Sequence, residues 1–249
     1  MTELLDKLDP YVRKARLYPA LILTVPIGFT ITLLLPDSGI ERLAPLAVAA
    51  GVPFAVTNIV RGQGQRLETR LVRRWGGMPT TRMLRLTDPT NNPDLLARRR
   101  HALQELTGLA LPTADEERRH PARADQRYVA ATRLLIGKLG TNTRTSHPRV
   151  HEELTNYGFW RNSAAIKPYA VTSLLLLLVV HAGLAFVGRD VTSVASGAAV
   201  TALAMTYWIS AVRPHRVRQH GETYACRLLE TLDWPTAAST PVAPAPPPA

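Results

Sequence analysis

The chain has 249 residues, enough for one or two domains, and 46% of them are hydrophobic, an ordinary share for a soluble protein. The apolar residues gather in four blocks, however, and nearly all charged residues lie between or outside these blocks. The net charge of +11 therefore fits the basic flanks of a membrane protein, and no nucleic-acid partner is expected. The single cysteine excludes an intramolecular disulfide.

Residues 1–17 form an N-terminal segment, and the two apolar blocks that follow predict a transmembrane hairpin over residues 18–60. The blocks cover residues 18–36 and 43–60 and carry no charge. A helix needs about 20 such residues to cross a hydrocarbon core about 30 Å thick. Pro26 and Pro53 are expected to break the two helices near their middles.

The last two apolar blocks predict a second hairpin over residues 168–212, with spans at 168–188 and 191–212. Each hairpin loop contains one basic residue, whereas the opposite ends of all four spans carry clusters of Lys and Arg. By the positive-inside rule, the loops face outwards and both chain termini are cytoplasmic. We expect the protein in the plasma or inner membrane.

Residues 61–167 are predicted to form a basic helical cytoplasmic domain, because they contain 20 Lys and Arg but only 10 Asp and Glu, and no alternating strand pattern persists. The expected helices run from Pro93 to Gly108, from a cap at Thr113 as far as Pro121, over residues 124–138, and from Pro148 towards Tyr157. Residues 213–234 predict one more amphipathic helix, and the Pro/Ala-rich residues 235–249 predict a disordered tail.

Two arginine clusters are candidate sites for an anionic ligand such as a nucleotide. Arg98, Arg99 and Arg100 are consecutive, and Arg118 and Arg119 form a second cluster. Guanidinium groups pair with phosphate in a forked geometry, which supports this interpretation. The alternative is that Arg98 to Arg100 form a solvated helix face or contact anionic lipid.

The most distinctive string lies just before the third span. Its aromatic and arginine side chains are typical of an anchor at the membrane interface, whereas its flanking asparagines favour a structured joint that couples the domain to the membrane. Gly158 within it is expected to permit a bend. The string contributes Asn156, Tyr157, Phe159, Trp160, Arg161 and Asn162.

His181 lies near the middle of the third span, where an ionisable group is costly unless it faces protein or water. One interpretation is a proton or ion pathway, and the other is a hydrogen bond to Thr201, Ser196 or Thr206 that ties two spans together.

Small residues recur every four positions on the fourth span, at Ser193, Gly197 and Thr201. This pattern predicts close helix packing, either within the chain or in a homo-oligomer.

Nothing in the sequence points to an enzyme, because the common nucleotide-binding, hydrolase and metalloprotease motifs are absent. His147 and His151, with Glu153 nearby, have the spacing of a metal pair on one helix face, but no third ligand is evident. We therefore expect no metal and no cofactor, and a membrane-bound enzyme that uses these three residues is the last of the alternatives.

Three strings carry a resemblance to uncharacterised bacterial membrane proteins with four spans. They are YGF-x-RN before the third span, the string WGGMPTT that starts at Trp75 and is followed by Leu84 and Arg85, and the segment with Ala124, Asp125 and Tyr128. The resemblance covers the middle domain and its flanking spans. It implies the architecture and no catalytic residues, and Trp160 stands where such proteins often have Arg.

Together these patterns predict an all-α integral membrane protein, with four transmembrane helices as two hairpins and a helical cytoplasmic domain inserted between them. The expected partners are the lipid bilayer, an anionic ligand or nucleotide, and further copies of the chain. The favoured function is a non-enzymatic sensor or effector that couples binding in the cytoplasm to the membrane helices. The alternative is a small transporter or channel accessory subunit with His181 in the path.

Overall fold

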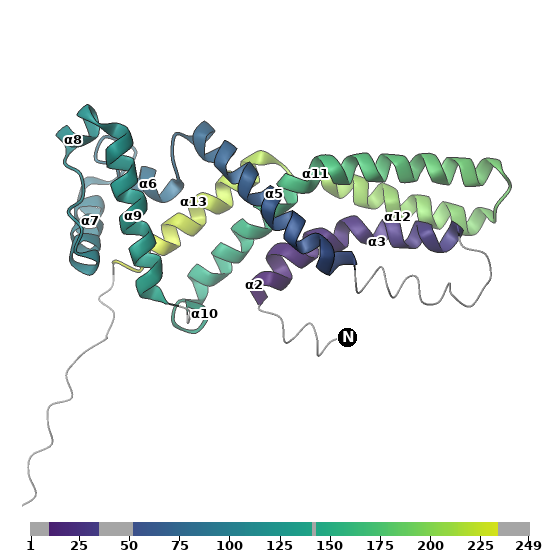
Figure 1. Cartoon of the computed structure of the whole chain (residues 1–249), viewed down its shortest axis with the longest axis horizontal. Coiled ribbons are helices and arrows are strands. Elements are labelled where there is room, and N and C mark those ends of the chain that lie inside the picture. The colour runs from purple at the N-terminus through teal and green to yellow at the C-terminus, as the bar shows by residue number, and fades with distance from the viewer. Residues whose placement is uncertain (1–9, 35–51, 141–142, 234–249) are drawn as a thin grey trace, which may run out of the picture. The chain divides into compact units, whose positions relative to one another are not determined.

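The computed structural model describes residues 10–34, 52–140 and 143–233, and all regular secondary structure in these ranges is helical (Figure 1). The all-α prediction is thus confirmed. The chain divides into two compact units. Unit 1 comprises Met1–Gly77 and Thr143–Tyr224, and unit 2 comprises Met78–Asn142 and Ala225–Ala249.

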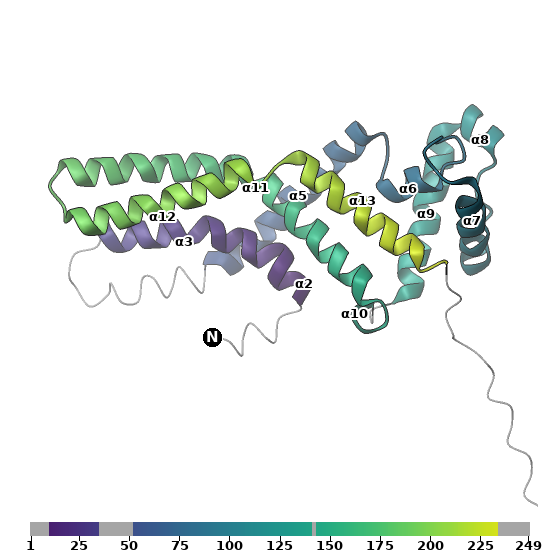
Figure 2. The same cartoon turned by 180° about the vertical axis from the view of Figure 1, so that it is seen from behind.

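Unit 1 is built around one long helix, α11, which packs against α12, α5, α3 and the π-helical segment η1. Figures 1 and 2 show α3, α11 and α12 side by side from opposite directions. The elements of unit 1 are α2 (Pro10–Val12), η1 (Arg13–Leu17), α3 (Tyr18–Leu34), α5 (Val52–Trp75), α10 (Thr143–Ser146), α11 (Pro148–Phe186), α12 (Val191–Ser210) and the first part of α13 (Pro214–Glu230).

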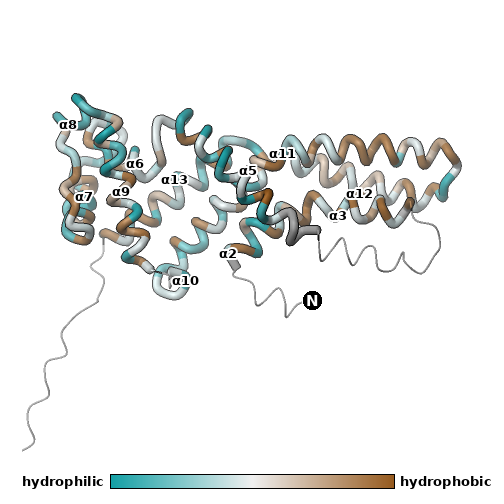
Figure 3. Tube along the Cα trace, viewed as in Figure 1, coloured by the Kyte–Doolittle hydropathy of each residue, from teal (hydrophilic) through white to brown (hydrophobic). Residues whose placement is uncertain are grey.

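Among the described residues of unit 1, two helical stretches are long and apolar enough to cross a membrane, Arg13–Thr32 and Pro148–Phe186. A third candidate is the pair Val191–Ser210 and Pro214–Glu230, two helices that meet at a bend of 62°. Apolar residues predominate in the second half of α11 (Figure 3), where large side chains such as Leu176 are exposed. Such exposure is compatible with a lipid surround, because contact of these side chains with water is unfavourable.

Of the second predicted span, residues 43–51 lie outside the described part of the chain. Val52–Val60 is the beginning of α5, which continues without a break to Trp75. The turn of the first hairpin and the Pro/Ala-rich tail also lie outside the described residues.

The interior of unit 1 is apolar where α3, α11 and α12 meet. Trp208 is its largest fully buried side chain, and it packs in one cluster with Ala20, Leu174 and Val212. Gly197 and Thr201 are buried and Ser193 is partly buried, so the small residues of α12 face the interior of this unit. Their close-packing role within the chain agrees with the pattern predicted from the sequence.

Unit 2 is a set of short helices whose beginnings are fixed by proline or by a side-chain cap. Proline occupies the first turn of three of them, where its missing N–H has no helical partner to lose. The predicted cap is present: Thr113 and Glu116 exchange hydrogen bonds of 2.9 and 3.2 Å between side chain and backbone. The elements are α6 (Pro79–Leu84), α7 (Pro93–Thr107), α8 (Ala114–Arg119), α9 (Pro121–Leu139) and the end of α13.

Helix α11 runs through Gly158 as one element of 39 residues, and its axis changes direction along its length (Figures 1 and 2). The missing side chain of Gly158 permits close packing, since a Cβ atom there would lie 3.0 Å from the Cβ of Ala15. The break expected at Pro26 is wrong, because α3 continues through this residue to Leu34.

Candidate functional site

A group of polar side chains joins three segments of unit 1, on the N-terminal side of the apolar part of α11. Its centre is Glu68 on α5, whose two carboxylate oxygens each accept one hydrogen bond of 2.8 Å, from the hydroxyl of Tyr157 and from the guanidinium of Arg161. The Arg161 side chain is only 13% exposed and that of Glu68 22%. Both partners are therefore shielded from water, which strengthens their attraction.

A second contact of the same group involves the amide of Asn162, which is fully buried and donates a 2.7 Å hydrogen bond to the backbone oxygen of Ala15. In an α-helix this oxygen would accept from the N–H group four residues later, but that residue is Pro19, which has none. Locally the helix takes the wider π form, in which the N–H of Tyr18 bonds to Arg13. Asn162 thus supplies the donor that proline removes.

Near the Asn162 hydrogen bond, the backbones of α5 and α11 approach each other closely. A Cβ atom at Gly64 would lie 2.0 Å from the Oδ1 atom of Asn162, so glycine is needed there for α5 and α11 to meet. We call Ala15, Gly64, Glu68, Tyr157, Arg161 and Asn162 the joint. It connects η1, α5 and α11, the three segments that lead directly into the apolar part of unit 1.

The remaining residues of the predicted string lie around the joint. Trp160 stacks on His220 of α13 and meets the edge of Phe159. Asn156 is partly buried, and within the described residues its side chain forms no hydrogen bond. The structure therefore brings Tyr157, Arg161 and Asn162 together at one site, and leaves Asn156 beside it.

The arginines predicted as a ligand site are engaged within unit 2. Arg98 donates to the backbone oxygen of Asp233, and Arg99 binds its carboxylate at 2.7 Å. Arg100 is buried and donates to the backbone oxygen of Leu84 at 2.9 Å and to the hydroxyl of Tyr128. The first cluster is thus no uniformly solvated face, and Arg100 has a structural role.

In the second cluster, Arg118 pairs with Asp115 within α8, and Arg119 is exposed. A ligand role for either cluster remains a prediction.

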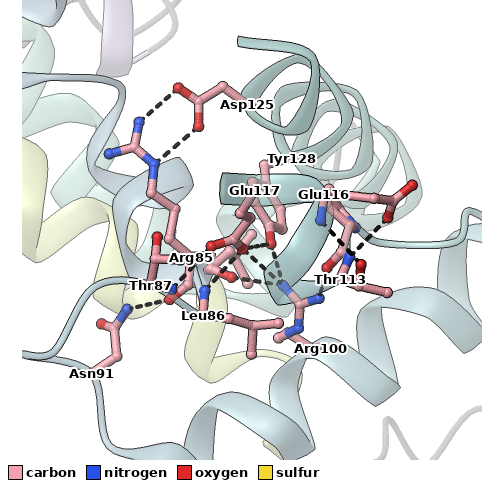
Figure 4. Close-up of polar contacts among 12 residues, drawn as sticks. Arg85, Leu86, Thr87, Asn91, Arg100, Thr113, Glu116, Glu117, Asp125 and Tyr128 are labelled. Atoms are coloured by element: carbon pink, nitrogen blue, oxygen red, sulfur yellow. Dashed lines mark hydrogen bonds and ion pairs between the residues drawn. The ribbon is translucent and has the colours of Figure 1, made fainter. Parts of the chain in front are cut away.

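Figure 4 shows the buried polar network to which Arg100 belongs. Glu117 accepts hydrogen bonds from Tyr128 and from the N–H groups of Leu86 and Thr87, the latter two at 2.9 Å. Burial alone would raise the pKa of Glu117, but these hydrogen bonds outweigh it, so its pKa lies below the usual value. Burial and the bond to Glu117 raise the pKa of Tyr128.

A small cavity of about 180 Å³ lies beside this network, where α8 meets α9. Half of its lining residues are basic, namely His120, Arg123 and Arg127, and Glu116 is the one acidic residue among them. Glu116 is already bound to Arg127 at 3.2 Å and to its cap. His120, at the N-cap of α9, shares one face of this helix with Arg123 and Arg127, since the three are spaced as i, i+3 and i+7. Sequence reasoning missed the cavity, because it did not show that Pro112 and Glu116 would lie opposite this face.

His181 has partners other than those predicted. Its Nδ1 atom lies 2.7 Å from the backbone oxygen of Leu177, and its Nε2 atom lies 3.4 Å from the hydroxyl of Thr30 on α3. Thr201, one of the expected partners, bonds to its own helix at Gly197. The ring therefore faces α3, the first predicted span. Both α3 and α12 pack against α11.

Within the described ranges, no group of three or more His, Cys, Asp or Glu side chains is arranged to hold a metal ion. In the part of the chain that the structure describes, the fold is all-helical and has two helices that are long and apolar enough to cross a membrane, or three such spans if the bent pair counts as one. No protein-family model, curated protein or solved structure matches the chain.

Proposed function

We propose that the chain is a non-enzymatic sensor or effector of the plasma or inner membrane. In this proposal it has four spans in two hairpins, its termini and unit 2 are cytoplasmic, and binding of an anionic ligand to unit 2 is transmitted to the spans. The resemblance to bacterial four-span membrane proteins is consistent with it.

The observation that carries the proposal is the joint. Glu68 and Asn162 hold η1, α5 and α11 together, next to the apolar parts of these segments. Beyond the joint, α5 ends at Trp75, and the chain enters unit 2 after Gly76 and Gly77. A displacement of α5 therefore acts on the first and third predicted spans together, rather than on one of them.

The basic cavity of unit 2 supports an anionic ligand. Arg123 is exposed at its rim, and Arg127 and His120 add positive charge within a space of about 180 Å³. This volume accommodates a phosphate group, whereas a whole nucleotide would leave its base outside. Guanidinium groups are well suited to phosphate, because they present paired N–H donors.

The test is dye release from liposomes that contain the full-length protein, with ATP, GTP, cyclic dinucleotides, inorganic phosphate and pyrophosphate as probes. We expect at least one probe to increase release, and Arg123→Gln to reduce its apparent affinity about tenfold, the loss of one charged hydrogen bond. The matched control is Arg133→Gln, an exposed arginine on the same helix that does not line the cavity. Equal responses of both variants, or no response to any probe by inserted protein, would contradict the proposal.

A specific observation also favours the second candidate, a transporter or channel accessory subunit. Three links join the backbone oxygens of Leu177 and Pro26 through His181 and Thr30, with lengths of 2.7, 3.4 and 2.9 Å. Each link needs one hydrogen, and the two terminal oxygens supply none. A neutral imidazole and a hydroxyl together supply two hydrogens, so only an added proton completes all three links.

This candidate predicts proton movement that depends on Thr30. In liposomes filled with a pH-sensitive dye, we expect a potassium diffusion potential to drive proton flux, and Thr30→Val to reduce the flux about tenfold. Thr32→Val, which removes a hydroxyl bonded to Phe29 on the same helix, should leave it unchanged. Absence of flux in the unaltered protein would remove this candidate.

A further inference from the structure

Two basic side chains of α13 lie against Trp160 of α11. The guanidinium carbon of Arg216 on α13 lies 4.9 Å from the ring centre of Trp160, and the imidazole of His220 stacks on the same ring system at 5.8 Å. Lys14 of η1 is near enough for its charge to act on His220. We call Lys14, Trp160, Arg216 and His220 the basic aromatic cluster.

The positive charge of this cluster is not balanced within the described part of the chain. Lys14 and Arg216 form no ion pair there, and Glu68 is already bound to the joint. Burial lowers the pKa of His220, and of the nearby charges only Glu153 opposes this, while Arg216 and Lys14 lower it further. Lys14 and Arg216 thus carry two positive charges, and the nearby carboxylate of Glu153 forms an ion pair with neither of them.

The position of the cluster matches the edge of the proposed membrane region. Lys14 lies four residues before α3 begins at Tyr18, and Trp160 lies eight residues, or about 12 Å of helix, before the uncharged run that starts at Pro168. The polar headgroup layer outside the hydrocarbon core is about 5–8 Å thick on each side. Trp160 therefore lies at the outer boundary of this layer, where long basic side chains extend towards the phosphate groups. Tryptophan and basic residues are enriched at this level.

We infer that the basic aromatic cluster binds a phosphate-bearing anion, of which the headgroup of an anionic phospholipid is the nearest source. The Lys14 ammonium and the Arg216 guanidinium would pair with the phosphate oxygens, and the Trp160 ring holds the guanidinium in place by a cation–π contact. The inference rests on the proposed membrane location, but it concerns a site in unit 1 that the proposed ligand cavity does not involve.

The test is native mass spectrometry of the full-length protein taken from bilayers that mix phosphatidylglycerol with phosphatidylcholine. We expect Lys14→Gln combined with Arg216→Gln to reduce retained phosphatidylglycerol about tenfold, since each basic residue near an anionic headgroup contributes roughly a fewfold gain in affinity. The matched control, Arg213→Gln combined with Arg70→Gln, removes two exposed charges of the same unit outside the cluster. Equal retention in the two double variants would overturn the inference.

A second arm separates the two sources of phosphate. Inorganic phosphate at about 10 mM is added to the extracted protein at low ionic strength, with chloride of matched ionic strength as the control for screening. Retention that survives phosphate identifies the lipid headgroup, whereas displacement by phosphate but not by chloride identifies a soluble anion at the same site. This assay contains no nucleotide and does not measure dye release, so a negative result would not contradict the sensor proposal. Failure of insertion would instead appear as loss of phosphatidylcholine as well.

Discussion

Glu117→Gln is expected to destabilise unit 2 by about 3 kcal/mol, because it removes one partner of a buried, hydrogen-bonded charge pair. Both carboxylate oxygens of Glu117 accept backbone N–H groups, from Leu86 and Thr87. In either orientation, a glutamine amide places an NH₂ group against one of these donors. The buried guanidinium of Arg100 also loses its counter-charge, which lies 3.9 Å away.

Hydrogen exchange in the intact protein measures this effect without requiring unit 2 to fold alone. Amides in α6 and α9 should lose about a hundredfold protection, which corresponds to the expected free energy. The matched control is Glu105→Gln, an exposed residue of α7 that pairs only with His101 and should change protection less than about threefold. Similar exchange in the two variants would show that the network does not stabilise the unit.

The same substitution has a defined pH dependence. The pKa of Glu117 is lowered by folding, so its stabilisation is fully present above the unfolded-state pKa of about 4.3 and is lost as the pH falls through the lower folded value. The glutamine side chain does not titrate. The difference in protection between the unaltered protein and Glu117→Gln should therefore narrow below about pH 4.

Asn162→Leu is expected to destabilise unit 1 by about 2 kcal/mol, because it leaves the buried backbone oxygen of Ala15 without a donor. The matched control is Asn156→Leu on the same helix, whose amide has no such partner among the described residues. Thermal unfolding in detergent, followed by circular dichroism, should show a clear decrease in midpoint for the first variant only.

Restoring the missing donor provides a sharper test of the same contact. Pro19→Ala returns an N–H group to the position four residues after Ala15, where it reaches the orphaned oxygen. We expect this change to recover part of the stability lost in Asn162→Leu, and to have little effect when Asn162 is intact. Additive effects of the two substitutions would mean that proline and asparagine are not coupled through this oxygen.

Local signals predicted most helix boundaries in unit 2. Proline at Pro93, glycine at Gly108 and the cap at Thr113 each act within one turn of the chain, so the sequence nearby is sufficient to place them. The burial of Tyr128 was likewise predictable from the apolar period of α9. The close packing of Gly158 against Ala15 could not be predicted, because it depends on which segment lies opposite this residue.

The partners within the joint were beyond prediction from local pattern. Tyr157 and Arg161 belong to the string singled out from the sequence, but their partner Glu68 lies 89 and 93 residues from them. Periodicity shows which face of a helix is apolar and does not show which helix covers it. The need for a donor at Ala15 was visible in principle, since Pro19 follows it by four residues, but the identity of the donor was not.

The length of α11 places both polar sites of unit 1 on one continuous element. The helix of 39 residues contains about 58 Å of helix, nearly twice the thickness of a hydrocarbon core, and it includes both the joint and His181. Pro168 lies between Asn162 and His181, and a proline inside a helix removes one backbone hydrogen bond and kinks the helix there. A movement of α11 at the joint therefore has to pass this proline before it reaches His181.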